Sequence, residues 1–120
     1  MTSPAKLTIF SLAALVSVTL PAALSRAAPN DAEYNTSIKC GTFFGFMNLV
    51  KPGAYKSKEM FFIRKGADRG EALGKSDEEV RQDFAAYRSR FSRDVQAGKI
   101  KNDAKTHEEF ELFCERQMHQ

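Results

Sequence analysis

The stretch SIKCGTFFGFMNLV, residues 37–50, decides the fold of this chain. Its large apolar residues recur at three- and four-residue spacing, which is typical of one face of an amphipathic helix. Phe44 and Phe46 widen that face. The stretch therefore predicts a short helix with a cysteine on its buried side, and the positions that define the face are Cys40, Phe43, Met47 and Val50.

Cys40 has one possible partner, because Cys114 is the only other cysteine of the 120 residues. The two are 74 positions apart, so one bridge closes nearly the whole folded region into a loop. In the chain-entropy model such a constraint on the unfolded chain stabilises the fold by about 4.5 kcal/mol, comparable to the stability of a small domain. The alternative is two unrelated thiols. We expect a Cys40–Cys114 disulfide.

The first 27 residues resemble an export signal. Lys6 precedes a charge-free apolar run, Leu7 to Leu20, and Ser25-Arg26-Ala27 offers small residues where a signal peptidase reads. The alternative is a membrane anchor, but a run of about 14 residues is too short to span a bilayer. We expect cleavage after Ala27 and a periplasmic or secreted product without a membrane segment, where a disulfide persists.

Removing the leader changes the charge. Of the 18 Lys and Arg side chains, Lys6 and Arg26 leave, so 16 basic side chains remain against 15 acidic ones. They are interspersed, which does not favour a nucleic-acid partner. Residues 28–36 show no apolar periodicity and are expected to form a flexible lead-in to a single domain, residues 37–120.

Three further helices are expected. One should run from about Ser57 to Leu73, and the next from a capping box at Ser76 to Gly98. A second capping box, Thr106 to Glu109, should open the last helix, which carries Cys114. The fold class is thus all-α, a small four-helix domain stapled by one disulfide between its first and last helices. The third helix has the clearest apolar stripe: Val80, Phe84, Tyr87, Phe91 and Val95.

Two groups of residues are candidates for binding a client or partner protein. The first is the aromatic and glycine set, for which a core role is the simpler interpretation because a small bundle has few other residues to fill itself. Gly66, Gly70 and Gly74 recur every fourth residue, either as a smooth groove for close approach or as a fraying helix end with its cap. The set comprises Phe43, Phe44, Phe46, Phe61, Phe62, Gly66 and Gly70.

The second group is the outer face of the third helix. Its arginines could dock an acidic partner, although such a run is more often a solvated face. Asp77 with Arg81, and Arg90 with Asp94, have the four-residue spacing of helical ion pairs. These are the candidate acid-sensitive pairs.

No catalytic or metal pattern is present in the sequence. The two histidines, His107 and His119, have no nucleophile in a recognisable arrangement, and no Cys-x-x-Cys or paired-histidine helix offers zinc ligands. We expect no enzyme activity, no metal and no cofactor.

The chain resembles the small periplasmic acid-stress chaperones of Gram-negative bacteria. The matching residues are Lys39-Cys40-Gly41-Thr42-Phe43-Phe44, the glycine pair Gly66 and Gly70, and Phe113-Cys114. Ile63 and Ala67 depart from the bulky aromatics that often surround that glycine pair in the family. The resemblance implies a helical domain held by one disulfide between an early and a late helix.

Two functions are expected as alternatives, and a structural or envelope-associated protein without a discrete ligand is a third. The first is a periplasmic stress-response protein of the holdase type, which opens in acid and offers aromatic surface to unfolding clients, because carboxylates that pair in the fold lose their charge. The second is a periplasmic inhibitor or immunity-type protein, which binds one partner protein through a rigid surface at neutral pH.

Overall fold

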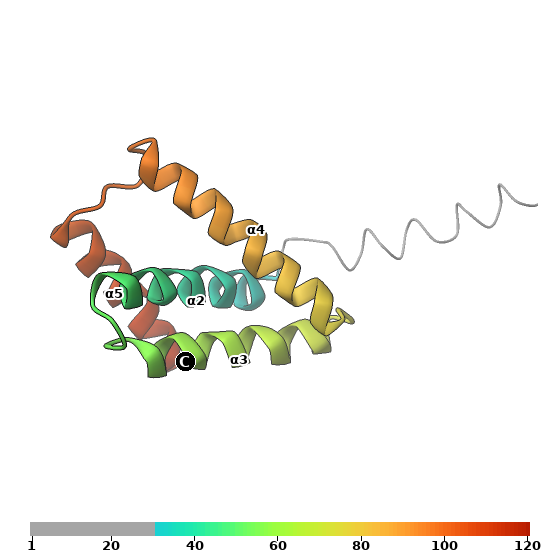
Figure 1. The fold of residues 1–120 in the computed structure, drawn as a ribbon. Coiled ribbons are helices and arrows are strands. Elements are labelled where there is room, and N and C mark those ends of the chain that lie inside the picture. The colour runs from blue at the N-terminus through green and yellow to red at the C-terminus, as the bar shows by residue number, and fades with distance from the viewer. Residues whose placement is uncertain (1–30) are drawn as a thin grey trace, which may run out of the picture.

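The computed structural model describes residues 31–120. The expected leader, its cleavage after Ala27 and the first part of the expected lead-in lie outside these residues. The described chain folds into four helices, as the sequence predicts, and Figure 1 shows their arrangement. They are α2 (Ala32–Val50), α3 (Lys56–Ala72), α4 (Asp77–Gln96) and α5 (Ala104–Met118).

Helix α2 begins five residues earlier than expected, so Ala32 to Thr36 are helical rather than a lead-in. Asp31 is the N-cap, and its carboxylate accepts a hydrogen bond from the Tyr34 N–H at 2.8 Å. Tyr34 and Ile38 are buried, which extends the apolar face by one turn. The cap and this additional packing explain why the helix starts here.

The predicted N-cap of α4 is confirmed, and the predicted N-cap of α5 is wrong. Ser76 and Glu79 form the predicted capping box of α4, with hydrogen bonds of 3.1 Å and 2.8 Å. Thr106 does not open α5. Asp103 is the N-cap, and its carboxylate accepts from the Thr106 N–H at 2.8 Å. An aspartate one turn upstream thus takes the role expected of Thr106.

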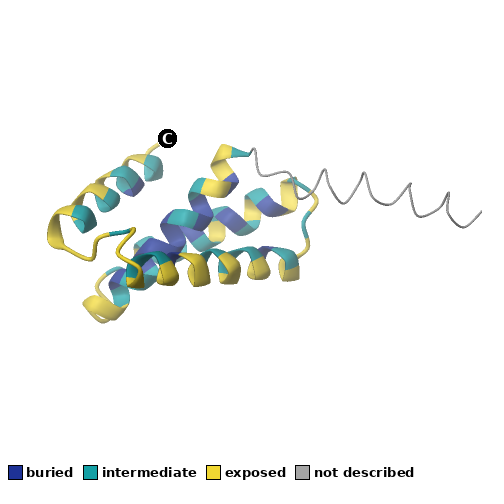
Figure 2. Ribbon diagram, turned by 90° about the horizontal axis from the view of Figure 1, so that it is seen from above, coloured by how far each residue is buried: buried dark blue, intermediate teal, exposed yellow. Residues whose placement is uncertain are grey.

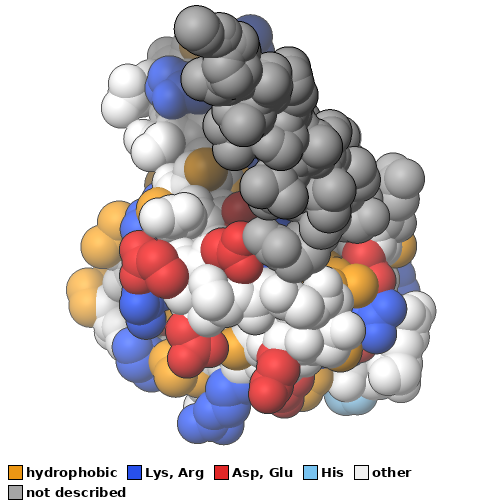
Figure 3. Space-filling view, turned by 90° about the vertical axis from the view of Figure 1, so that its right-hand side faces the viewer, with side chains coloured by type: hydrophobic (Ala, Val, Ile, Leu, Met, Phe, Trp, Pro, Cys, Tyr) orange, Lys and Arg blue, Asp and Glu red, His pale blue; other side chains and the backbone are white. Residues whose placement is uncertain are grey.

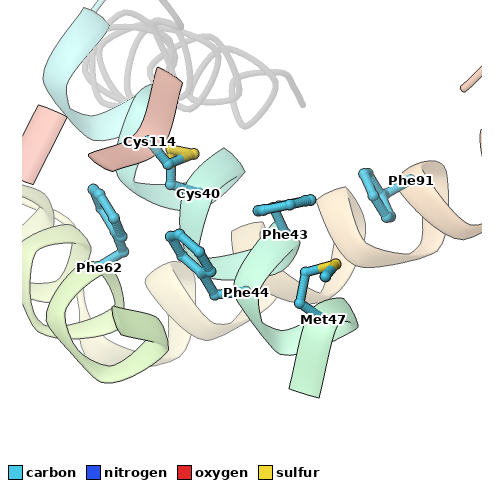
Figure 4. Close-up of a cluster of buried hydrophobic side chains, with 7 residues drawn as sticks. All are labelled: Cys40, Phe43, Phe44, Met47, Phe62, Phe91 and Cys114. Carbon is cyan, nitrogen blue, oxygen red and sulfur yellow. A yellow bond between two sulfur atoms is a disulfide. The ribbon is translucent and has the colours of Figure 1, made fainter. Parts of the chain in front are cut away.

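Helix α2 is the centre of the core, because three of its rings reach three different helices. The ring of Phe43 stacks on Phe110 of α5, with centroids 4.6 Å apart. Phe44 faces Phe62 of α3 at 6.0 Å, and Phe46 meets the edge of another ring, from α4, at 5.4 Å. Figure 4 shows Phe43 and Phe44 of α2 between Phe62 of α3 and Phe91 of α4, together with the disulfide.

The predicted Cys40–Cys114 disulfide is present and joins α2 to α5. Both cysteines are fully buried, with Cα atoms 5.7 Å apart. Lys58 of α3 adds an ionic link to α5 through Glu111, at 3.3 Å, and Glu115. The contacts that hold the last helix therefore include a covalent bond, an aromatic stack and a cation between two carboxylates.

The glycines Gly66 and Gly70 of α3 are buried where other helices pass closely. A Cβ on Gly70 would lie 2.6 Å from Val80 Cγ2 and 3.2 Å from the Tyr34 ring, and one on Gly66 would lie 3.2 Å from the Phe84 ring. Close approach is thus the role of this pair, but toward helices of the same chain. Gly74 has a φ of 85°, as a helix terminus requires.

Loss of the disulfide should destabilise the fold severely. We expect the double variant C40A/C114A to lose up to about 4.5 kcal/mol of unfolding free energy, because the unfolded chain is no longer constrained. Urea unfolding followed by circular dichroism measures this loss. The parent protein after reduction should show the same shift. An unchanged midpoint in both samples would contradict the prediction.

Candidate protein-binding surface

Most of the aromatic residues predicted as a client or partner surface lie in the core. Phe43, Phe44 and Phe62 are at most 1% exposed, so in the folded state they bind nothing outside the chain. Phe46 and Phe61 are half-buried. Of these two, Phe46 also lines a large surface depression.

This depression, which we call the trough, has a volume of about 1020 Å³. Its floor is α2, and its walls are the first half of α3 and the length of α4. Gly41, Thr42 and Gly45 lie on the floor. Apolar side chains dominate the rest of the lining, and those that matter below are Phe46, Leu49, Ile63, Phe84, Ala85 and Phe91.

The trough exists because α3 and α4 meet at one end and separate toward the other (Figure 1). They meet where Val80 and Phe84 pack on the buried glycines of α3. The Tyr34 hydroxyl also donates to the Asp83 carboxylate at 2.6 Å, which holds α2 against the start of α4. Farther along, Ile63 of α3 is left facing the open space rather than α4.

Helix α5 does not fill this space, because it packs on the other side of α2. Cys40 and Phe43 contact α5, whereas Gly41, Gly45 and Leu49, which recur every fourth residue, line the trough. Figure 2 shows α5, the helix that ends at the C label, across α2 from α4. Within residues 31–120, the trough is therefore a face of the central helix that no helix covers.

The charged groups on α4 differ from the predicted ion pairs. Arg81 pairs with Glu78, at 2.6 Å, rather than with Asp77, and this contact lowers the pKa of the Glu78 carboxyl. Arg90 lies over the Tyr87 ring at 5.1 Å instead of pairing with Asp94. Arg81 thus pairs with a carboxylate three residues away instead of four, and Arg90 contacts an aromatic ring instead of a carboxylate.

Ion pairs between helices are the feature that sequence reasoning missed. Arg69 of α3 reaches Asp31 at 2.6 Å, and Lys58 reaches two carboxylates of α5. Lys75, in the link before α4, reaches Asp83 of α4 at 3.1 Å. Asp31 also accepts from the Tyr34 N–H. These partners are between 8 and 57 positions apart, so no helical spacing in the sequence could have indicated them.

These contacts shift the pKa values of the carboxyls in one direction. The hydrogen bond from Arg69, with that from the Tyr34 N–H, lowers the pKa of Asp31. The hydrogen bond from Lys58 lowers the pKa of Glu115 and in turn raises the pKa of the ammonium. Each carboxylate is therefore more stable in its charged form in the fold than in the unfolded chain.

Thr42 is an unsatisfied polar group on the trough floor. It is 7% exposed, and its Oγ1 has no hydrogen-bond partner among the described residues. A buried hydroxyl without a partner costs about 1–3 kcal/mol. Since the hydroxyl oxygen is closed to solvent, it is an unpaired group of the core.

The histidines show no catalytic arrangement within residues 31–120. His107 bonds to Asn102 at 2.8 Å and meets the edge of Phe46 at 5.8 Å. No group of three or more histidine, cysteine or acidic side chains in this part of the chain could hold a metal ion. None of the described helices is long and apolar enough to cross a bilayer.

Comparison of the chain with protein-family models, with curated proteins and with solved structures gave no match.

Replacing Thr42 by Val should stabilise the isolated protein. Valine keeps the shape and removes the unpaired hydroxyl, and the two residues have similar helix propensities, so we expect a gain of about 1 kcal/mol in unfolding free energy. Urea unfolding measures it. Thr36→Val, on the half-buried N-terminal part of α2, serves as the control and should change stability little. A less stable T42V protein would contradict the prediction.

Proposed function

We propose that this protein is an exported, acid-responsive chaperone of the holdase type. The supporting observation is that carboxylates link the helices to one another: Asp31 links the start of α2 to α3, Glu111 and Glu115 link α5 to α3, and Asp83 receives the Tyr34 hydroxyl of α2. Acid removes the charge of such carboxylates. The contacts between helices therefore weaken together when the pH falls.

The sign of the effect follows from the pKa shifts. Asp31 and Glu115 have pKa values below their ordinary 3.8 and 4.5. Their stabilisation is complete above the unfolded-state pKa and is lost as the pH falls through the lowered folded-state pKa. The helices should thus loosen below about pH 4. At neutral pH these links are intact.

Net charge acts in the same direction. Basic and acidic side chains are interspersed on the face shown in Figure 3. Full protonation of the 15 carboxylates and both histidines leaves residues 28–120 with the 16 basic side chains and two imidazolium groups, a side-chain charge of +18 instead of +1. Self-repulsion then favours an expanded chain.

Loosening would uncover the aromatic core while two of the four helices stay joined. The disulfide keeps α2 joined to α5, whereas α3 and α4 are held by non-covalent contacts: packing, ion pairs and hydrogen bonds. Movement of α3 and α4 exposes Phe44, Phe62 and Phe91, which are at most 5% exposed in the fold. These rings are the surface that we propose for unfolded clients.

The proposal is tested by client aggregation at pH 2–3. We expect the protein to suppress aggregation of an acid-unfolded client there and not at pH 7. D31N/E115Q removes two of the linking carboxylates, so its unfolding free energy should fall less between pH 7 and pH 3 than that of the parent. D68N/E109Q, at two exposed carboxylates, makes the same change of charge and should behave like the parent. Equal aggregation with and without the protein would refute the function.

The trough supports a second function, an inhibitor or immunity-type protein that binds one partner at neutral pH. Such a protein needs a preformed surface, and the trough is open in the folded state, with Leu49 81% exposed beside it. Large exposed apolar patches mark interaction sites.

A hydrophobic dye followed from pH 7 to pH 2 separates the two functions. A large rise of fluorescence on acidification is expected of the holdase. A signal already present at pH 7 that stays flat in acid would contradict acid opening and favour the neutral-pH partner.

A further inference from the structure

We propose that the trough is a binding site for an amphipathic α-helix of a partner protein, one that carries an acidic side chain opposite Arg88. This inference rests on the second function above, partner binding at neutral pH, and names the chemistry of the partner. It does not require opening of the core in acid.

The shape of the trough fits a helix. Three helices surround it, with α2 as the floor and α3 and α4 as the walls, so an occupant would complete the bundle on the side of α2 away from α5. The α4 residues of the lining extend from Glu78 to Gln96. At 1.5 Å per residue this wall is about 27 Å long, which corresponds to about five helical turns.

The floor has one position where a helix backbone could come close. Gly45 lines the trough, and a Cβ there would meet the Glu59 carboxylate alone within 4 Å. Gly41 is already covered, because the Phe84 ring lies 3.0 Å from the position of its Cβ. A small residue such as Gly45 lets two helices approach, and the side chains around it then act as walls for the ridge of the incoming helix.

An extended peptide fits less well than a helix. Extended peptides gain affinity by pairing their backbone with an exposed strand edge, and every wall of the trough is a helix whose backbone groups are already paired. A helical occupant satisfies its own backbone. Its apolar face would cover Phe46, Leu49 and Ile63.

Charge indicates the polar part of the partner. Four charged residues line the trough, and three of them have partners: Glu78 pairs with Arg81, and Glu59 accepts from the Asn48 amide at 2.7 Å. Arg88 is exposed and has no ion pair among the residues that the structure describes. A carboxylate on the occupant therefore has one position where it gains a partner.

The test uses a display library of 18-residue helical peptides in which the residues of one face are randomised. The library is selected at pH 7 for binding to the protein in the form that the cell produces. We expect enriched peptides to carry apolar residues at helical spacing and an acidic residue on the flank. No enrichment, or enrichment of peptides without helical spacing, would overturn the proposal.

Paired variants of α4 locate the binding. Ala85 and Ala86 are adjacent and exposed, and Ala85 alone lines the trough. A85R should weaken binding of an enriched peptide at least tenfold, and A86R should leave it unchanged. Equal binding by the two variants would place the peptide elsewhere and overturn the proposal.

Charge exchange tests the acidic contact. R88E should weaken an enriched acidic peptide about tenfold and be rescued when the peptide's acid is changed to lysine. R93E changes an exposed arginine outside the trough and should leave binding of the same peptide unchanged. Failure of the rescue would refute the contact with Arg88.

The holdase assay at pH 2–3 on A85R should match the parent, so failure of the trough and failure of acid activation remain distinguishable.

Discussion

The fold depends on the aromatic rings that α2 sends toward its three neighbours. Within four residues, Phe43 stacks on α5, Phe44 faces α3 and Phe46 meets α4. Because a helix turns by about 100° per residue, consecutive positions point in different directions, and a short aromatic stretch can thus serve as the common core of a small bundle. The disulfide fixes the helix that packs least extensively, α5, to this centre.

This construction also leaves one side of α2 uncovered. The residues between the core rings are small, and Phe84 packs against Gly41 and Gly66 so closely that α4 lies directly on α2 and α3 at one end. From this close approach α4 diverges from α3 farther along (Figure 1), and Ile63 and Leu49 there line the trough. Tight packing at the glycines and the open trough are therefore consequences of one geometry.

The charges show a similar division between contacts within and between helices. The surface pair of Glu78 and Arg81 contributes little, since both side chains are well solvated. The links between helices involve partly shielded side chains, such as Lys58, whose ammonium also lies 5.7 Å from the Phe44 ring. An acid response of the whole domain would arise from such links, because they hold helices together rather than stabilise one helix.

The sequence by itself determined the four helices, the cap at Ser76, the disulfide and the burial of Phe43 and Phe44, because these follow from local spacing and from the presence of two cysteines alone. It placed the starts of α2 and α5 wrongly, since Asp31 and Asp103 cap helices whose first turns carry weak periodicity. Only the tertiary structure decided which carboxylates pair between helices, which face of α2 lines the trough and which of the trough's charged side chains have partners among the described residues. Those properties depend on how helices distant in sequence cross, and no pattern within one helix encodes the angle at which another helix passes it.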